Sequence, residues 1–277
     1  MKYLCNAHTH TTYCDGKTPI LEMIERAVAL GFTALGFSGH AHEGIDPKYE
    51  MSVEGQAEYL RTLRALQKEE TRLRLWVGLE RGSLSHAARA PYDYIIGSTH
   101  TFRQPLDGQY FAVDSSADSL RQLLEKRYLG DGLALARDYY AQEVDYITSF
   151  RPEIIGHFDL VMKNNEELRL FDPESEAYRR LAASALERAF HGCTLLELNT
   201  GGMARCAHVH APYPSMYLLG LWREMGGRVI LTSDCHDARY LDYAFDESLA
   251  LLRRAGYASV CALGGFGEEM LVQREID

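Results

Sequence analysis

The sequence lacks long apolar runs and carries no excess of positive charge. No apolar stretch approaches the roughly 20 residues that a membrane-spanning helix needs, and no signal-peptide pattern opens the chain. With 29 Lys and Arg against 39 Asp and Glu, the formal net charge is −10. This charge argues against nucleic-acid binding, although bound cations could still attract a small anionic substrate. We therefore expect neither a membrane nor a nucleic acid as a partner.

Paired cysteines and nucleotide-binding signatures are also absent. The six cysteines form no C-x-x-C pair, and with no signal peptide they predict a cytoplasmic protein with reduced thiols. The sequence contains neither G-x-G-x-x-G nor a P-loop, which counts against folds built around nucleotide cofactors. No feature indicates an oligomeric state.

Strand-like and helix-like segments alternate along the chain. Its 277 residues suffice for one large barrel or two modest domains, and without a linker or repeat we expect a single domain over 1–277. Short apolar runs predict strands at about 3–9, 33–38, 73–79, 92–98, 153–156, 194–199 and 228–233, with a further apolar stretch at 257–263. Helical spacing covers about 19–30, 55–71, 117–128, 131–149, 173–191, 214–225 and 240–255, and a long loop is expected over 102–116.

This alternation predicts an α/β fold with parallel strands and right-handed crossovers. The number of units fits a closed (β/α) barrel, and a doubly wound open sheet is the alternative. In such barrels the active site lies at the carboxyl ends of the strands.

The first motif, His8-Thr9-His10, follows an apolar run and precedes Asp15. Two histidines at i and i+2 of an extended segment point the same way, because strand side chains alternate between faces. Neutral imidazole is a common metal ligand, and ligand-type side chains recur at the later strand ends. The candidate metal ligands are His8, His10, Asp15, His40, Glu80, His100, His157, Asp234 and His236.

These candidates exceed what one ion needs, because a catalytic zinc takes about three protein ligands. We therefore expect two to three divalent ions, with a carboxylate bridging two of them. Paired ions about 3.5–4 Å apart clamp the attacking and leaving oxygens in phosphate-ester hydrolysis. Zn, Mn and Fe all suit mixed His and carboxylate ligands, and the sequence does not choose among them.

Taken in order, the motifs resemble those of the PHP (polymerase and histidinol phosphatase) superfamily over essentially the whole chain. They are His8-Thr9-His10, Gly39-His40, Gly78-Leu79-Glu80, Gly97-Ser98-Thr99-His100, Gly156-His157-Phe158-Asp159 and Ser233-Asp234-Cys235-His236. Within it the chain looks most like the monofunctional histidinol-phosphate phosphatases, on the segments Ser38-Gly39-His40-Ala41-His42 and Glu197-Leu198-Asn199-Thr200-Gly201-Gly202.

The resemblance implies a distorted (β/α)7 TIM-like barrel with a trinuclear metal centre at the carboxyl ends of its strands. Its first site would use His8, His10 and Asp234, with Glu80 bridging to a second site at His100 and His157. Its third site would use Asp15, His40 and His236. The implied activity is hydrolysis of L-histidinol phosphate to L-histidinol and phosphate, a step of histidine biosynthesis.

For the mechanism we expect a hydroxide that bridges two ions to attack phosphorus in line. Glu80 and Asp234 would take part through the ions. His42 is expected to assist the leaving oxygen or to bind phosphate. Arg205, Lys163 and Arg103 are the candidate cations for a small phosphorylated substrate. The segment with His208 and His210 departs from the family pattern, and we interpret both as loop residues, not as a fourth metal site.

Other functions are possible for the same motifs. The nearest alternative is a PHP phosphoesterase acting on another small ester, such as a sugar or nucleotide phosphate. A polymerase-associated PHP module is disfavoured by the net negative charge and the absence of polymerase segments. A metal-dependent amidohydrolase also begins with H-x-H, but such barrels usually carry a bridging lysine, where this chain offers Glu80.

Overall fold

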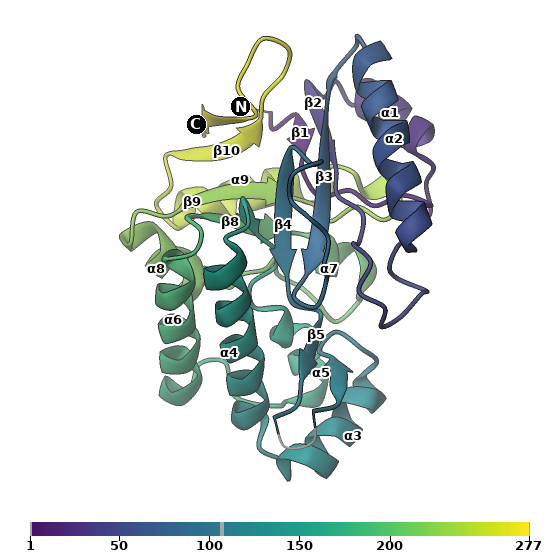
Figure 1. Cartoon of the computed structure of the whole chain (residues 1–277). Helices are drawn as coiled ribbons and strands as arrows, with labels where there is room; N and C mark the ends of the chain where they lie inside the picture. Colours follow the sequence, from purple (N-terminus) through teal and green to yellow (C-terminus); the bar gives the residue numbers. More distant parts are fainter. Residues whose placement is uncertain (1, 106–107, 277) are drawn as a thin grey trace.

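The computed structural model describes residues 2–105 and 108–276. A nine-stranded sheet runs through it in the order β1-β2-β3-β4-β7-β8-β9-β10-β11 (Figure 1). Its neighbours pair in parallel from β1 to β10, and β11 adds antiparallel to β10. The strands are β1 (Cys5–Asn6), β2 (Ala34–Phe37), β3 (Arg74–Gly82), β4 (Tyr94–Ser98), β7 (Ile154–Ile155), β8 (Leu195–Asn199), β9 (Arg228–Thr232), β10 (Ser259–Leu263) and β11 (Leu271–Glu275).

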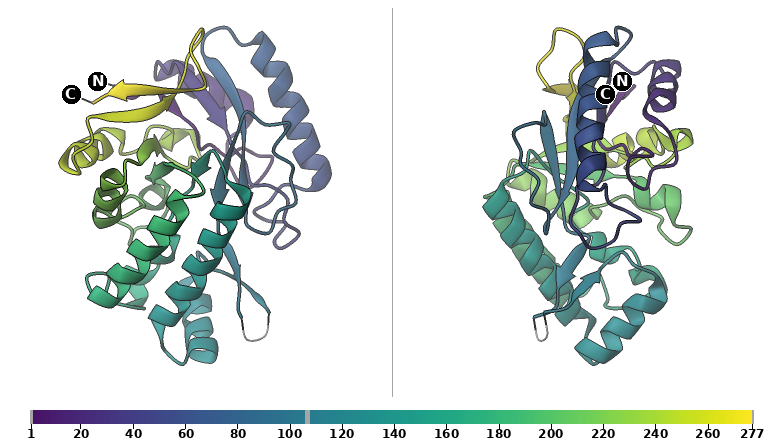
Figure 2. Two further views of the ribbon diagram at one scale, coloured as in Figure 1. Left: turned by 60° about the vertical axis from the view of Figure 1, so that its left-hand side comes forward. Right: turned by 45° about the vertical axis from the view of Figure 1, so that its right-hand side comes forward.

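Helices cover the outside of this sheet. The helices α4 (Gly132–Phe150) and α6 (Glu176–Phe190) lie side by side. Beyond them, α3 (Ala117–Tyr128) lies next to the hairpin of β5 (Thr101–Arg103) and β6 (Tyr110–Ala112) (Figures 1 and 2). Several helices begin at a Ser or Asp whose side chain accepts a hydrogen bond from the backbone two or three residues on, as Ser52 does from Gly55. The longer helices are α1 (Ile20–Ala29), α2 (Val53–Glu69), α3 (Ala117–Tyr128), α4 (Gly132–Phe150), α6 (Glu176–Phe190), α8 (Met216–Glu224) and α9 (Phe245–Arg254). The short ones are η1 (Leu160–Met162), α5 (Asn165–Leu168), α7 (Gly201–Arg205) and η2 (Ala238–Tyr240).

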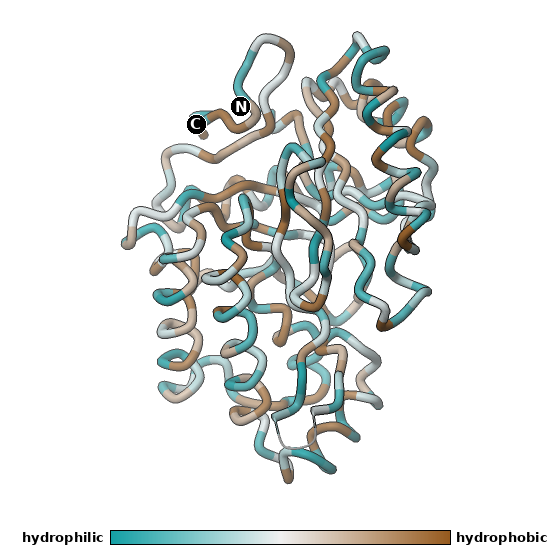
Figure 3. The backbone as a smooth tube through the Cα atoms, in the orientation of Figure 1, coloured by the Kyte–Doolittle hydropathy of each residue, from teal (hydrophilic) through white to brown (hydrophobic). Residues whose placement is uncertain are grey.

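The strands form the core because they are apolar on both faces, as parallel strands covered by helices must be. Leu79, Ile95 and Ile96 are fully buried. The residues of the central strands are mostly hydrophobic, whereas hydrophobic and hydrophilic residues alternate along α4 and α6 (Figure 3). No helix among the described residues has the length and apolar character to cross a membrane.

The sheet curls, so that the segments following its first and seventh parallel strands meet. Thr9 and Cys235 form a parallel bridge. The backbone N–H of His10 donates to the carbonyl of Cys235 at 2.8 Å, and the N–H of Cys235 donates to the carbonyl of His8 at 2.9 Å. This closure favours a TIM-like barrel over the doubly wound open sheet.

Most of the predicted elements are present, and three expectations need correction. The segment 102–116 is not simply a loop: β5 (Thr101–Arg103) and β6 (Tyr110–Ala112) form an antiparallel hairpin that buries Phe102, while 106–107 lie outside the described residues. The strand expected at 3–9 shortens to β1, because its regular pairing with β2 ends at Asn6 and Thr9 bridges to Cys235 after β9. The strand β11 was not predicted.

Candidate metal centre

The carboxyl ends of the parallel strands bring together all the candidate ligands named above. Each of these residues has an imidazole nitrogen or a carboxylate oxygen within 4.0 Å of such an atom of another candidate ligand. His8, His10 and Asp15 follow β1, His40 follows β2, Glu80 belongs to β3, His100 follows β4, His157 follows β7, and Asp234 and His236 follow β9.

Glu80 is the common neighbour of five of the six candidate histidines, and its side chain is 1% exposed. Its Oε2 atom faces three imidazoles: His40 Nδ1 at 2.9 Å, His8 Nε2 at 3.2 Å and His10 Nε2 at 3.4 Å. Its Oε1 atom faces two more, His157 Nε2 at 3.0 Å and His100 Nε2 at 3.4 Å. A carboxylate with both oxygens surrounded in this way is suited to bridge two cations.

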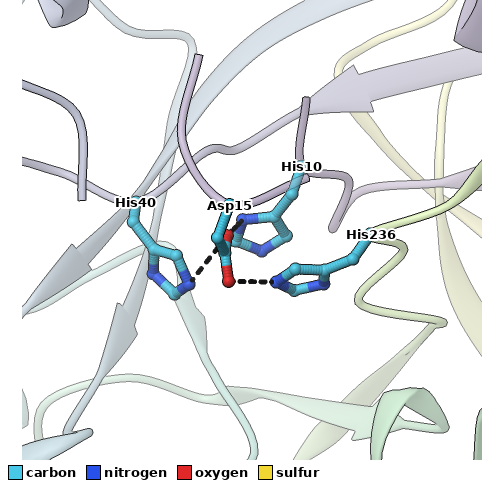
Figure 4. A group of neighbouring side chains, drawn as sticks. All are labelled: His10, Asp15, His40 and His236. Carbon is cyan, nitrogen blue, oxygen red and sulfur yellow. Dashed lines mark ion pairs between the residues drawn. The ribbon is translucent and has the colours of Figure 1, made fainter. Parts of the chain in front are cut away.

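A second cluster forms around Asp15, where three imidazole rings converge on one carboxylate (Figure 4). His236 Nε2 lies 3.1 Å from one oxygen, and His10 Nδ1 and His40 Nε2 lie 3.6 and 3.7 Å from the other. The ligand atoms of these four residues all lie within 4.8 Å of one another. His10 therefore reaches both clusters, because its other nitrogen faces Glu80 and Asp234.

The ligand groups differ in detail from the implied sites. His8, His10 and Glu80 form one compact group, and His40 joins Glu80 and His100 in another. The third combines His10 with Asp15, His40 and His236. His10 and His40 are thus shared between groups, because both nitrogens of each ring face carboxylates.

Several buried polar atoms in this region have no hydrogen-bond partner, which favours a bound cation. An unpartnered polar atom in a protein interior costs free energy, so buried donors and acceptors are normally satisfied. Among the described residues, the unpartnered buried side-chain atoms include His8 Nε2, His10 Nε2, Asp15 Oδ1, Glu80 Oε2 and Asp234 Oδ1. Mixed imidazole and carboxylate donors of this kind fit Zn, Mn or Fe.

The pKa values of the buried histidines fall into two groups, because neighbouring carboxylates raise those of His8 and His40 despite their burial. Burial lowers the pKa of His10 to about 3 and that of His100 to about 4, so both imidazoles keep a free lone pair at neutral pH. Burial raises the pKa of Glu80, but His8 and His40 outweigh it and hold that pKa well below its usual range. The carboxylate is therefore ionised and available to cations.

Asp234 occupies an unusual backbone position. Its φ of 45° lies in the left-handed region, which is uncommon for residues other than glycine and often marks a functional site. The segment after the neighbouring strand β8 approaches Asp234 closely, because a Cβ atom at Gly201 would lie 2.7 Å from Cβ of Asp234. Glycine at 201 thus allows this aspartate to turn toward the histidines.

A cavity of about 660 Å³ opens onto the cluster. Of the predicted substrate-binding cations, Arg205 and Lys163 line it. Arg205 Nη2 donates to Asp234 Oδ2 at 2.8 Å, and Lys163 Nζ lies 3.6 Å from the carboxylate of Asp114. Both cations therefore line the same cavity as several of the candidate ligands.

Other predicted residues face elsewhere. Within the described part of the chain, His42 and Arg103 are not among the residues that line the cavity. His42 Nδ1 lies 3.1 Å from the Met51 carbonyl, and Arg103 Nε donates to the Gly108 carbonyl at 3.3 Å inside the hairpin.

His208 and His210 also lie apart from the cluster. Their rings face Glu167 and Glu166 of the short helix α5, at 3.9 and 3.7 Å. Neither residue lines the cavity, and neither belongs to a potential metal-binding group among the described residues.

One residue next to the cluster was missed. Glu197 of β8 is fully buried, and its Oε1 atom lies 2.6 Å from Nδ1 of His8. A carboxylate in an otherwise apolar strand was the signal that could have revealed it, because an ionised group is rarely buried without partners.

Known proteins resemble this chain in sequence or in fold. A curated "Probable histidinol-phosphatase" of Schizosaccharomyces pombe (strain 972 / ATCC 24843) is 22% identical over 283 residues, covering 93% of this chain and 89% of that protein. The crystal structure of a protein of Listeria monocytogenes, provisionally described as the histidinol phosphatase hisK, superposes with a TM-score of 0.68 at 18% identity, covering 88% of this chain and 99% of that chain.

A second solved structure is that of histidinol phosphate phosphatase from Lactococcus lactis subsp. lactis Il1403, in complex with Zn, L-histidinol and phosphate. It gives a TM-score of 0.58 at 18% identity and covers 94% of this chain and 96% of that chain. These likenesses support the α/β fold with its curled, mainly parallel sheet. The model of the PHP domain family matches residues 6–201, which is more than half of the sequence. The chain therefore belongs to the PHP domain family.

Proposed function

We propose that this protein is a metal-dependent phosphomonoesterase that hydrolyses L-histidinol phosphate to L-histidinol and phosphate. The observation that carries the proposal is Glu80, a buried carboxylate faced by five imidazoles at the edge of a cavity. Clustered histidines and carboxylates of this kind suit the binding of several metal ions, which serve phosphate-ester hydrolysis. The names of the relatives, one of them solved with Zn, L-histidinol and phosphate, favour this substrate.

We infer that the centre lies in one domain, at the carboxyl ends of a distorted (β/α)7 barrel formed by β1–β4 and β7–β9. It would hold two to three divalent ions of Zn, Mn or Fe. When bound, such ions neutralise phosphate charge and supply hydroxide from water at neutral pH. The residues that would hold them are His8, His10, Asp15, His40, Glu80, His100, His157, Asp234 and His236.

The other lining residues suit the substrate. The Asp234 carboxylate keeps the pKa of Arg205 raised despite its burial, so Arg205 stays cationic and can contact a phosphate oxygen. Lys163 adds a second positive charge. The acidic side chains Asp46 and Asp114 also line the cavity and can accept hydrogen bonds from the substrate ammonium. We keep Arg205 and Lys163 as substrate-binding residues and set aside His42 and Arg103, whose side chains face Met51 and Gly108.

A panel of phosphate monoesters tests the proposal. We expect kcat/KM for L-histidinol phosphate to exceed that for sugar phosphates and nucleoside monophosphates by orders of magnitude. Higher kcat/KM for one of these other esters would instead establish a PHP phosphoesterase with a different substrate. No hydrolysis of any ester by metal-loaded protein would overturn the proposed reaction class.

A further inference from the structure

Glu197 is a buried carboxylate at the centre of the sheet, and the proposed reaction gives it no direct role. It lies on β8, two residues before the carboxyl end of the strand, and its side chain is 0% exposed. We propose that Glu197 is a positioning residue that fixes the tautomer and orientation of His8 for metal binding. This inference rests on the proposed metal-dependent function.

Glu197 accepts four hydrogen bonds, two on each oxygen. Its Oε1 atom accepts from the Thr232 hydroxyl at 2.6 Å and lies 2.6 Å from His8 Nδ1. Its Oε2 atom accepts from the backbone N–H of His157 at 2.8 Å and from Asn199 Nδ2 at 3.0 Å. The carboxylate thus ties together the ends of β1, β7, β8 and β9, from which candidate ligands project.

The contact with His8 decides which of its ring nitrogens is free. An ionised carboxylate can only accept, so the proton of the neutral imidazole belongs on Nδ1. The lone pair then remains on Nε2, which lies 3.2 Å from Glu80 and 3.5 Å from Asp234 and has no hydrogen-bond partner. Partners of this kind orient metal-bound histidines and raise their basicity.

An amide of the same shape could not replace this carboxylate. Each oxygen of Glu197 already meets two donors, as the distances above show. A glutamine presents two further donors on its nitrogen, so in either orientation one pair of donors would face an NH2 group. The backbone N–H of His157 can only donate, whereas the His8 ring and the Thr232 hydroxyl can also accept, so the glutamine NH2 group belongs on the His8 side. Glu197→Gln therefore either turns the His8 ring or reverses its tautomer.

The effect should be local within the metal centre. Among the described contacts, Glu197 touches His8 and the backbone of His157, but it forms no hydrogen bond or ion pair with Asp15, His40 or His236. An ion held mainly by the cluster around Asp15 should therefore be insensitive to Glu197. Asp15→Asn provides the matched control, because it removes the carboxylate of the Asp15 cluster and leaves Glu197 and His8 intact.

The experiment titrates metal-stripped protein with Zn²⁺ or Mn²⁺ against a competing chelator and counts ions per chain. Substituting a residue that hydrogen-bonds to a metal ligand typically weakens metal affinity 10–100-fold. We expect Glu197→Gln to weaken the binding of some of the ions to this extent and to leave the others bound with wild-type affinity. Asp15→Asn should weaken a different ion, and the double variant should show both losses. Wild-type affinities in Glu197→Gln, or equal weakening of every ion, would overturn the proposal.

Two further measurements separate positioning from a purely structural role. If Glu197 only supports the fold, Glu197→Gln will lower the urea midpoint of the metal-free protein while leaving the metal affinities unchanged. If this variant does not fold, Glu197→Asp keeps the charge but draws the oxygens away from His8, and unchanged affinities there would also refute the role. Because these titrations contain no phosphate ester, a different substrate would leave their outcome unaffected.

Discussion

Arg205 and Asp234 form a close pair in which Nη2 of Arg205 lies 2.8 Å from Oδ2 of Asp234. The other oxygen of this carboxylate lies 3.1 Å from Nε2 of His10 and 3.5 Å from Nε2 of His8. Each oxygen thus has a separate task, one toward the arginine and one toward the histidines. Although burial raises the pKa of Asp234, Arg205 and His8 hold it well below its usual range.

We predict that Arg205→Gln lowers kcat/KM for L-histidinol phosphate by about 100-fold or more, because removing one preorganised donor at a reacting group typically costs that much. Arg205→Lys keeps the charge but loses the planar guanidinium, which donates to Asp234 and lies 2.6 Å from His236 Nδ1. The activity of this variant should therefore lie between that of wild type and that of Arg205→Gln. Steady-state kinetics on metal-loaded protein measure both effects. Activity of Arg205→Gln within threefold of wild type would rule out the role.

Lys163 and Arg103 form a contrasting pair of predicted substrate cations. Lys163 lines the cavity, whereas Arg103 folds back on the hairpin. Lys163→Ala should raise KM about tenfold, the scale of one charge-assisted hydrogen bond. Arg103→Ala should stay within about twofold of wild type. The opposite order of KM values would show that the hairpin moves over the substrate.

The clustering of the candidate ligands could be predicted because each follows or ends an apolar run, and parallel strands bring such ends to one edge. Glu80 and His157 are examples: they lie 77 residues apart but meet at 3.0 Å. Glu197 was missed because its role depends on a contact across 189 residues of sequence, which strand periodicity does not reveal. For the same reason the orientation of His42 could not be predicted, since nearness to His40 in sequence does not indicate that the ring turns toward the Met51 carbonyl.

Glu143 of α4 should make stability depend on pH. Burial is the main cause that raises its pKa from 4.5 to about 8. The folded state therefore favours the protonated acid, and its stability falls as pH rises from about 4.5 to about 8, by up to about 1.4 kcal/mol per pH unit. Above this range the penalty is constant.

Glu143→Gln resembles the protonated acid and removes this titration. We expect the variant to be similar to wild type in urea midpoint near pH 5 and more stable than wild type at pH 9. Urea unfolding of both metal-loaded proteins at the two pH values measures the difference. A constant difference across this range would show that Glu143 is ionised in the folded protein at low pH.

The most direct test of the account returns metal stepwise to stripped protein while ions per chain and L-histidinol phosphate hydrolysis are measured in the same samples. A multinuclear centre predicts negligible turnover below two bound ions per chain, because single ions cannot clamp both the attacking and the leaving oxygen. Turnover should then rise to its full value as the second and third ions bind. Full turnover with fewer than two ions per chain would contradict the account.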